Sequence, residues 1–201
     1  MLILGIDPGT ATTGYGLIEV GEDYAKRVLI SVKDYGLIET EKNGYSPKRY
    51  QVIYRTLNTL LEKWIPDYMV IEKIFFATNA KTAIKVGQAQ GVMMLAAAFN
   101  NIEVAEYAPG TIKKVITGSG RAKKKEVQEC VVKILGRFEG GKLGVNKERR
   151  ITKTHIDNMI DAFAIAMTHA SKIIKGFEII NDGETISSTN ANAIDIPRLN
   201  I

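Results

Sequence analysis

The stretch Leu2–Gly16, LILGIDPGTATTGYG, decides how the rest of the chain is arranged. An apolar run over Ile3, Leu4 and Ile6 ends in one carboxylate, Asp7, and a Pro-Gly turn follows at once. Such a run is typical of a strand buried on both faces. A charge near its end is costly unless another group offsets it, and a metal ion would be such a group. Asp-Pro-Gly is also ordinary turn chemistry, so this stretch alone leaves turn cap and metal ligand equally open.

Length and composition predict one globular domain followed by a tail. The chain has 201 residues, of which 45% are hydrophobic and 24% charged, as in ordinary soluble proteins. We expect a domain over residues 1–176 and an acidic, polar tail over residues 177–201. The sequence has neither an apolar run of ~18 residues nor a basic and apolar leader, so we expect a cytoplasmic protein with no membrane partner. The single cysteine, Cys130, excludes an internal disulfide, so a metal would be held by oxygen or histidine ligands.

The positive charge of the chain is concentrated in one region. The formal net charge is +5, yet residues 109–153 alone hold thirteen Lys or Arg and four Glu. Within this region, residues 136–150 are rich in Gly, Lys and Arg with little periodicity, which indicates a basic loop insertion. Such a concentration favours a polyanionic partner, nucleic acid above all, over a merely solvated basic face.

Apolar periodicity predicts five strands and five helices. The strands are expected around Ile3–Asp7 and over Thr13–Val20, Arg27–Glu39, Tyr68–Ile71 and Ile102–Tyr107, and the helices over Tyr50–Trp64, Asn79–Phe99, Thr111–Ile116, Lys123–Leu135 and Thr152–Ile174. The first three strands are joined by short turns, which predicts an antiparallel meander with a bend near Asp34. The element order predicts an α/β fold, a five-stranded mixed sheet with helices on both faces.

One predicted helix, Asn79–Phe99, has little polar surface beyond residue 86. A helix that is apolar on most sides must be buried on most sides. We therefore expect this helix to cover the sheet, to form part of a subunit interface, or to do both.

Three further polar residues could join Asp7 in a metal site. Glu72 ends the fourth strand as Asp7 ends the first, so the two lie side by side if their strands are neighbours. On the last helix, Asp161 stands at the edge of the apolar stripe. Asp157 lies about 40° from it around the helix axis, and Asn158 about 60° on the other side. Hard oxygen ligands from three elements would suit Mg²⁺ or Mn²⁺.

Several of these residues also have explanations without chemistry. The spacing Thr154-x-x-Asp157 matches a helix capping box, which we favour over ligation for Asp157. Glu72 could pair with one of the many lysines. His155 and His169 lack the spacing of a metal or catalytic pair and are predicted to be structural, and Cys130 is predicted to be a core residue.

Several uncommon strings occur in the order of one known family. They are GIDPGT-x₃-GYG at the start, IEKIFF-x₂-NA-x₆-GQAQG, EYAPGTIKK with the following Lys cluster and EVQ, and IDAFAIAMTHA. The chain resembles the RuvC-type Holliday junction resolvases, or crossover junction endodeoxyribonucleases, over roughly residues 1–170. The resemblance implies a ribonuclease-H-like fold, a homodimer, and binding of four-way junction DNA. It also implies Mg²⁺-dependent, paired nicking of opposing strands in recombination and repair, with two ions per active site.

The resemblance also assigns residues. Asp7 matches the carboxylate that bridges the metals, Glu72 the second acid and Asp161 the acid of the last helix. Phe75 matches an aromatic that the family inserts at the junction. Lys113 and Lys124 match lysines near the cleaved phosphate, so Lys124 is expected to be catalytic as well as DNA-binding. Lys123 and Arg121, in the same basic cluster, are expected to bind DNA.

The chain departs from the family pattern at one metal position. The family has an acid or a histidine three residues before the last Asp, where this chain has Asn158. Asp157 could substitute for it, Asn158 could be an introduced inactivating change, or the protein could be slow or silent. We favour the first. A catalytically weak junction-binding protein is the main alternative, and a branch-migration complex is a further possible partner. A sugar-kinase or actin-like ATPase needs a second similar domain, for which the chain is too short.

Overall fold

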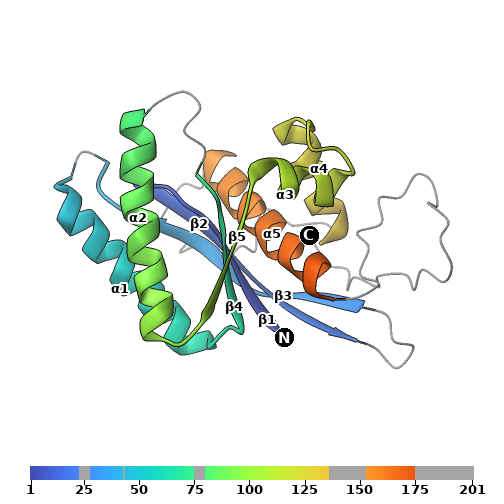
Figure 1. Cartoon of the computed structure of the whole chain (residues 1–201), viewed down its shortest axis with the longest axis horizontal. Helices are drawn as coiled ribbons and strands as arrows, with labels where there is room; N and C mark the ends of the chain where they lie inside the picture. The colour runs from blue at the N-terminus through green and yellow to red at the C-terminus, as the bar shows by residue number, and fades with distance from the viewer. Residues whose placement is uncertain (23–27, 43, 75–79, 136–152, 175–201) are drawn as a thin grey trace, which may run out of the picture.

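The computed structural model describes residues 1–22, 28–42, 44–74, 80–135 and 153–174. The elements follow one another as β1 (Leu2–Asp7), β2 (Thr12–Glu22), β3 (Val28–Glu39), α1 (Ser46–Trp64), β4 (Tyr68–Glu72), α2 (Ala80–Phe99), β5 (Glu103–Tyr107), α3 (Pro109–Thr117), α4 (Lys124–Ile134) and α5 (Lys153–Ile173). All five strands and five helices that the sequence predicts are present (Figure 1). The basic insertion, the tail and Phe75 lie outside the described residues.

The strands form one mixed sheet in the order β3-β2-β1-β4-β5. β1, β2 and β3 pair antiparallel, which confirms the predicted meander, while β4 is parallel to both β1 and β5. Between β2 and β3 the register shifts, because Leu17 pairs with Asp34 and Ile18 with Val32. Lys33 is therefore the extra residue of a β-bulge, which places the bend next to the residue where the sequence predicts it.

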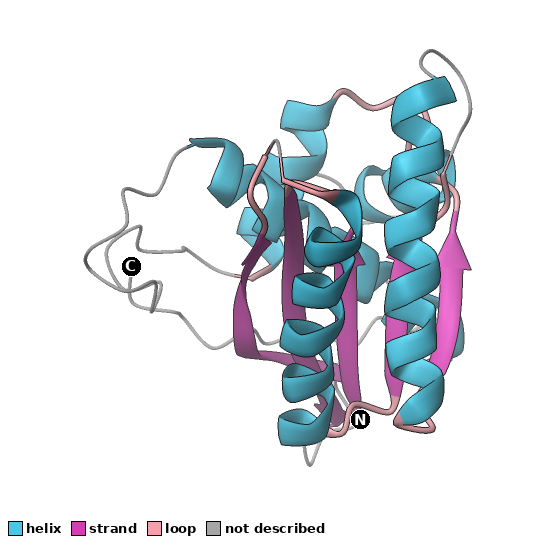
Figure 2. Ribbon diagram, turned by 90° about the vertical axis from the view of Figure 1, so that its left-hand side faces the viewer, coloured by secondary structure: helices cyan, strands magenta, loops and turns pink. Residues whose placement is uncertain are grey.

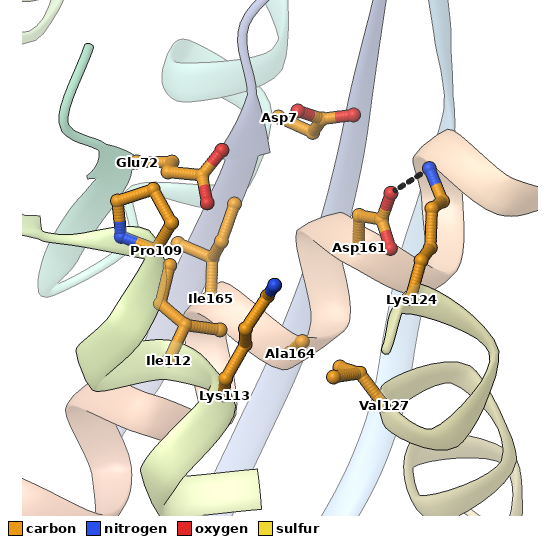
Figure 3. A pocket seen from close by; sticks show the side chains of 10 residues that line it. All are labelled: Asp7, Glu72, Pro109, Ile112, Lys113, Lys124, Val127, Asp161, Ala164 and Ile165. Atoms are coloured by element: carbon orange, nitrogen blue, oxygen red, sulfur yellow. Dashed lines mark ion pairs between the residues drawn. The ribbon is translucent and has the colours of Figure 1, made fainter. Parts of the chain in front are cut away.

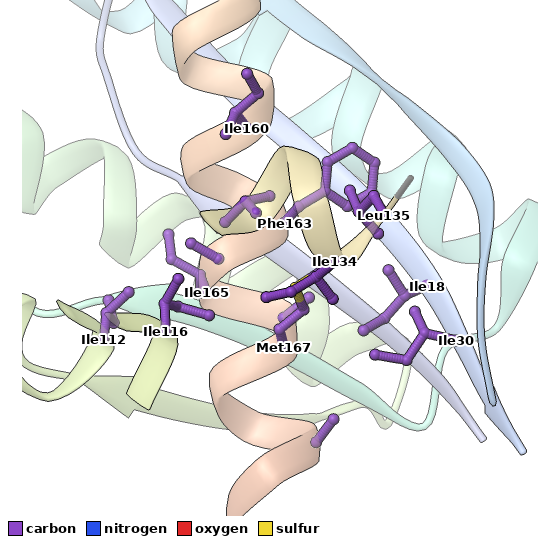
Figure 4. Packing of buried hydrophobic residues seen from close by; sticks show 14 of the residues in the cluster. Ile18, Ile30, Ile112, Ile116, Ile134, Leu135, Ile160, Phe163, Ile165 and Met167 are labelled. Carbon is purple, nitrogen blue, oxygen red and sulfur yellow. The ribbon is translucent and has the colours of Figure 1, made fainter. Parts of the chain in front are cut away.

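Helices cover both faces of the sheet (Figure 2). α1 and α2 pack on one face, and α5 lies across the other with α3 and α4 beside it. The sheet separates two hydrophobic cores, and β1 contributes to each of them. Leu4 and Ile6 pack with α1 and α2 on one face, and Ile3 packs with α5 on the other. All three side chains have at most 1% of their surface exposed, as predicted for a strand buried on both faces. Figure 4 shows the core between the sheet and α5, where Phe163 and Met167 of α5 pack with Ile18 and Ile30 of the meander.

Glycines in β1 and β2 let α5 lie directly on the sheet. Gly5 pairs with Gly16 across the two strands, and Gly14 pairs with Asp7. A Cβ atom at Gly5 would stand 2.0 Å from the backbone oxygen of Ala162, and one at Gly14 would stand 2.2 Å from that of Asn158. Because no larger residue fits at either position, the α5 backbone approaches the strand ends closely enough to bring its side chains over Asp7.

One side of α2 is buried and the other is exposed. Ala89, Met93 and Ala96 belong to the core between the helix and the sheet, which confirms that α2 covers the sheet. On its outer side, however, Ile84, Leu95 and Phe99 keep 56%, 51% and 68% of their surface exposed. The expectation that the helix is buried on most sides is therefore wrong for the single chain, because only one side faces the sheet.

Candidate active site

Asp7 and Glu72 stand side by side at the carboxyl ends of two parallel strands. Ile6 of β1 pairs with Ile71 of β4, and each acid is the next residue of its strand. Side chains alternate between the faces of a strand, so Asp7 lies on the same face as Ile3, and Glu72 on the same face as Val70; both are on the face covered by α5. The neighbour relationship expected from the sequence is confirmed.

The third acid, Asp161, comes from α5 and completes a pocket of about 330 Å³. Side chains from β1, β4, α3, α4 and α5 surround it, namely Asp7, Glu72, Pro109, Ile112, Lys113, Lys124, Val127, Asp161, Ala164 and Ile165. Figure 3 shows the three carboxylates and the Lys113 ammonium pointing into the same space. Ile112, Val127, Ala164 and Ile165 make part of the lining apolar, and apolar surroundings strengthen the interactions between the charged groups.

The three carboxylates disturb one another's protonation. Burial, and then the negative charges of Asp161 and Glu72, raise the pKa of Asp7 to about 7, against a smaller opposing effect of Lys124. Burial likewise raises the pKa of Glu72, with Asp161 adding to the rise. Burial also raises the pKa of Asp161, although Lys124 opposes it. Acids this close are stabilised by a cation that shares them, and hard carboxylate oxygens are the donors that Mg²⁺ prefers.

Lys124 supplies positive charge at this site. Its Nζ atom lies 2.6 Å from Oδ2 of Asp161 (Figure 3). Burial lowers the pKa of Lys124, but the hydrogen bond to Asp161 and the charges of Asp161, Asp7 and Asp157 outweigh that effect and raise it. Lys113 lines the opposite side of the pocket, and its charge partly offsets the raised pKa of Glu72.

Two predicted ligands, Asp157 and Asn158, do not line the pocket. The charge of Asp157 nevertheless raises the pKa of both Asp161 and Lys124, so it lies near them. Asn158 packs against Gly14, the partner of Asp7. α5 begins at Lys153, so Thr154 lies inside the helix and not at its N-cap. The capping-box interpretation of Asp157 is therefore wrong, because that box requires Thr154 to precede the helix.

The other predicted DNA-binding residues lie beside the pocket. Lys123 and Arg121 are exposed at the start of α4 and in the turn before it, and neither lines the pocket. The backbone N–H of Lys123 donates to Oε2 of Glu126 at 2.7 Å, which fixes the helix start next to Lys124. The predicted role of Phe75 falls outside the described residues.

The two histidines and the cysteine are placed as the sequence predicts, away from the pocket lining. His169 is buried, and its Nδ1 atom lies 2.9 Å from the Tyr107 hydroxyl. Nε2 of His155 lies 3.6 Å from Oε1 of Glu39. Cys130 is half-buried and packs against the core under α5.

Sequence reasoning missed two residues that support the site. The side chain of Gln90, in the GQAQG string of α2, donates from Nε2 to the backbone oxygen of Glu72 at 2.7 Å. Arg49 is buried and donates from Nε to the Thr40 hydroxyl, which in turn donates to the backbone oxygen of Thr10 in the turn after Asp7. A glutamine or arginine on the buried side of an amphipathic helix is the signal that could have identified them, because a buried polar group requires a partner.

Within the described ranges, no three acidic, histidine or cysteine side chains already meet as ligands of one metal ion. Asp161 is instead paired with Lys124. The donor set nevertheless fits a hard divalent cation, since three mutually repelling carboxylates from three elements line one pocket.

Comparison with known proteins identifies the family. The family model described as crossover junction endodeoxyribonuclease RuvC matches residues 3–169. Curated relatives of that name include those of Fusobacterium nucleatum, 40% identical over 86% of this chain and 82% of the relative, and of Prochlorococcus marinus, 42% identical over 84% and 95%.

Solved structures agree with this result. The structure of Thermus thermophilus RuvC is similar with a TM-score of 0.67 at 29% identity, covering 85% of this chain and 93% of that one. The yeast mitochondrial Holliday junction resolvase Ydc2 shares the fold, with a TM-score of 0.57 at 19% identity over 83% of this chain and 76% of that one. The architecture is thus the predicted ribonuclease-H-like fold. The chain belongs to the RuvC family of crossover junction endodeoxyribonucleases.

Proposed function

We propose that this protein is a Holliday junction resolvase, an endonuclease that nicks two opposing strands of four-way junction DNA. The observation that carries the proposal is the pocket in which Asp7, Glu72 and Asp161 meet Lys113 and Lys124. The curated relatives are named crossover junction endodeoxyribonucleases, and T. thermophilus RuvC has been solved in complex with a Holliday junction substrate at 26% identity and a TM-score of 0.64. Such an enzyme acts in DNA recombination and repair.

Metal ions would be held by Asp7, Glu72 and Asp161. We propose Mg²⁺ as the ion, two per active site, with Mn²⁺ able to substitute. When bound, such ions lower the pKa of an attacking water and stabilise negative charge on the leaving 3′-oxygen. Asp7 is suited to be shared between the ions, because it is the acid whose pKa both other carboxylates raise.

The fourth ligand is proposed to be Asp157 rather than Asn158. Its charge acts on Asp161 and on Lys124, which supports a position of Asp157 close to both residues. A carboxylate also binds Mg²⁺ more strongly than an amide oxygen does. The Asp157 side chain does not line the pocket in the free protein, so the proposal requires it to turn toward Asp161 when a metal ion binds.

The lysines act on the phosphate. Lys113 and Lys124 stand on either side of the pocket and can bind the non-bridging oxygens of the scissile phosphate. There they would stabilise the charge that builds in the transition state. Lys123 at the start of α4 and Arg121 in the turn before it extend this positive surface and would bind neighbouring phosphates. Phe75, three residues after Glu72, is proposed to stack on an unpaired base at the junction.

The exposed side of α2 is proposed to bind a second copy of this chain. Ile84, Leu95 and Phe99 give it an apolar character, and Tyr54 of α1 meets the Phe99 ring edge-on at 6.5 Å, so the patch continues onto α1. A two-fold homodimer would present the same pocket to two opposing strands, which explains paired cuts. A branch-migration complex in the cytoplasm is the expected cellular partner. No helix in the described residues is long and apolar enough to cross a membrane.

The deciding experiment compares a synthetic four-way junction with a linear duplex of the same sequence in Mg²⁺. The wild-type protein is expected to cut the junction symmetrically and to leave the duplex intact. Asp7→Asn is expected to abolish cutting while junction binding persists or tightens, because the change removes a negative charge close to DNA. If the wild type binds the junction but cuts in neither Mg²⁺ nor Mn²⁺, the silent junction-binding protein is the correct interpretation.

A further inference from the structure

We propose that Gln90 is a positioning residue that fixes the metal-binding carboxylate Glu72 from the opposite face of the sheet. The inference rests on the proposed function in one respect, namely that Glu72 binds a metal ion. The hydrogen bond that carries it, from Nε2 of Gln90 to the backbone oxygen of Glu72 at 2.7 Å, is a feature of the fold alone.

Glu72 stands where the sheet pairing runs out on one side. β1 and β4 pair from Ile3 and Tyr68 as far as Ile6 and Ile71, so Glu72 is the first residue of β4 beyond that ladder. A strand end that loses its neighbour is free to fray. Here the side chain of Gln90 donates a hydrogen bond to the backbone oxygen of Glu72, which a neighbouring strand would otherwise provide.

The other side of Glu72 is held by β5. Glu72 pairs with Tyr107, and the backbone N–H of Lys73 donates to the Tyr107 oxygen at 2.8 Å. The Tyr107 hydroxyl lies 2.9 Å from Nδ1 of the buried His169 on α5. The strand end that carries Glu72 is therefore bounded by β5 on one side and by the Gln90 amide on the other.

Gln90 is the one buried polar side chain in the described part of α2, with 6% of its surface exposed. Its neighbours on that side, Ala89 and Met93, are buried and apolar. An amide in such a place costs free energy unless it is hydrogen-bonded, and the bond is stronger in these apolar surroundings than in water. Leu or Met would fill this buried position at lower cost. The amide therefore indicates that the backbone oxygen of Glu72 needs a hydrogen-bond donor here.

The first experiment measures metal binding without DNA. Gln90→Met keeps the length of the side chain but removes the donor, and Mn²⁺ affinity is measured by calorimetry with Mg²⁺ competition. We expect affinity to fall about 10-fold or more, as is usual when a residue that supports a metal ligand is lost. The matched control is Gln88→Met on the same helix, which removes a bond to the Tyr50 hydroxyl that does not reach β4; its affinity should equal that of the wild type.

A double-mutant cycle separates positioning from general damage. In a Glu72→Ala background, Gln90→Met should no longer change the Mn²⁺ affinity, because the group that Gln90 positions has been removed. An equal loss of affinity in both backgrounds would overturn the proposal, since Gln90 would then act through the fold as a whole. So would wild-type affinity in a folded Gln90→Met protein.

A second measurement needs no variant and no metal. The side-chain NH₂ group of Gln90 is observed by nuclear magnetic resonance in the wild-type protein, with Gln88 as the exposed reference. Exchange of the Gln90 protons with water should be at least 10-fold slower, because the group is buried and bonded. Equal exchange at the two glutamines would overturn the hydrogen bond itself. A wild-type protein that neither binds metal nor cuts junctions would instead overturn the proposed function and leave this measurement valid.

Discussion

Nζ of Lys124 lies 2.6 Å from Oδ2 of Asp161, so one of the three pocket carboxylates carries its own counter-ion. The Lys124 side chain is 57% exposed, whereas Asp161 is 24% exposed. Because the lysine is mostly exposed and Asp161 is only half-buried, water can take the place of either partner, and ion pairs between exposed groups contribute only about 0–1 kcal/mol. The pair therefore balances the charge of Asp161 in the free protein, and under the proposed function Lys124 would exchange Asp161 for a phosphate.

Replacing Lys124 should change metal binding and cleavage in opposite directions. In Lys124→Met the carboxylates lose a competing cation, so we expect Mg²⁺ affinity to rise about threefold. Cleavage at saturating Mg²⁺ should fall about 100-fold, because the lysine charge that stabilises the negative charge of the transition state is lost. Calorimetry and single-turnover cleavage of a four-way junction measure the two effects.

Lys125→Met is the control for that variant. Lys125 is exposed, pairs with Glu129 at 3.5 Å and does not line the pocket. It should keep wild-type metal affinity and cleavage at saturating junction concentration. If Mg²⁺ affinity and cleavage both fall in Lys124→Met, Lys124 supports the fold of the pocket and does not exchange Asp161 for a phosphate.

The raised pKa of Asp7 predicts how stability depends on pH without metal. The ordinary pKa of 3.8 applies to the unfolded chain, and the pKa is about 7 in the folded protein. The protonated acid therefore stabilises the fold fully below pH 4, and this contribution is lost as the pH rises through 7. In EDTA, Asp7→Asn should match the wild type near pH 4 and exceed its free energy of unfolding by about 4 kcal/mol at pH 8.

Urea unfolding of the two proteins across this pH range measures the difference. Glu62→Gln alters an exposed acid on α1 that accepts a hydrogen bond from Nδ2 of Asn58; this variant is the control and should follow the wild type. A constant difference between Asp7→Asn and the wild type from pH 4 to pH 8 would contradict the raised pKa. Excess Mg²⁺ should restore the stability that the wild type has lost by pH 8, because the ion favours the charged carboxylates.

The two candidates for the fourth ligand can be told apart by substitution. Asp157→Asn should weaken Mn²⁺ binding about 10-fold, and Asn158→Ala should leave it within about twofold of the wild type. Asn158→Asp should strengthen binding, because it adds an acid where the family has one. A larger loss for Asn158→Ala than for Asp157→Asn would assign the ligand to the amide.

Much of this site could be predicted because its acids mark the ends of periodic segments. Asp7 and Glu72 each follow a short apolar run, and carboxyl ends of parallel strands meet at one edge of a sheet. Asp161 stands beside the apolar stripe of the last helix, so its side chain had to lie at the border of the core. These are local patterns that burial imposes on the sequence directly.

The rest depends on distances between segments that a sequence does not give. The capping-box spacing of Thr154 and Asp157 failed because α5 begins at Lys153, two residues too early for Thr154 to cap it. The bonds from Gln90 to Glu72 and from Lys124 to Asp161 join residues 18 and 37 positions apart. Which side of α2 stays exposed follows from how the helix lies on the sheet, since both sides are apolar in sequence.

The exposed side of α2 should hold the dimer together. Leu95→Glu with Phe99→Glu places two charges on the patch, so we expect a monomer in sedimentation velocity experiments at concentrations where the wild type is a dimer. The monomer should keep its fold, since both side chains are more than half exposed. Its cuts in a junction should become single and uncoordinated.

Ile173→Glu is the control for the dimer variant. Ile173 is 40% exposed on α5, which covers the opposite face of the sheet. This protein should remain a dimer and make paired cuts. A wild-type protein that is a monomer at all concentrations, with or without junction DNA, would contradict the α2 interface.

The close approach of α5 predicts that Gly5 and Gly14 tolerate no side chain. A methyl group at Gly14 would meet the Asn158 backbone oxygen at 2.2 Å, so α5 must shift away from the strand that carries Asp7. Gly14→Ala should lower the free energy of unfolding by about 3 kcal/mol, and cleavage by the folded fraction should fall because Asp161 moves with the helix. Gly21→Ala is the matched control in the same strand. No atom of the described residues lies within 4 Å of its methyl group, so stability should change by about 0.5 kcal/mol or less. Equal urea midpoints for the two variants would mean that α5 does not rest on Gly14.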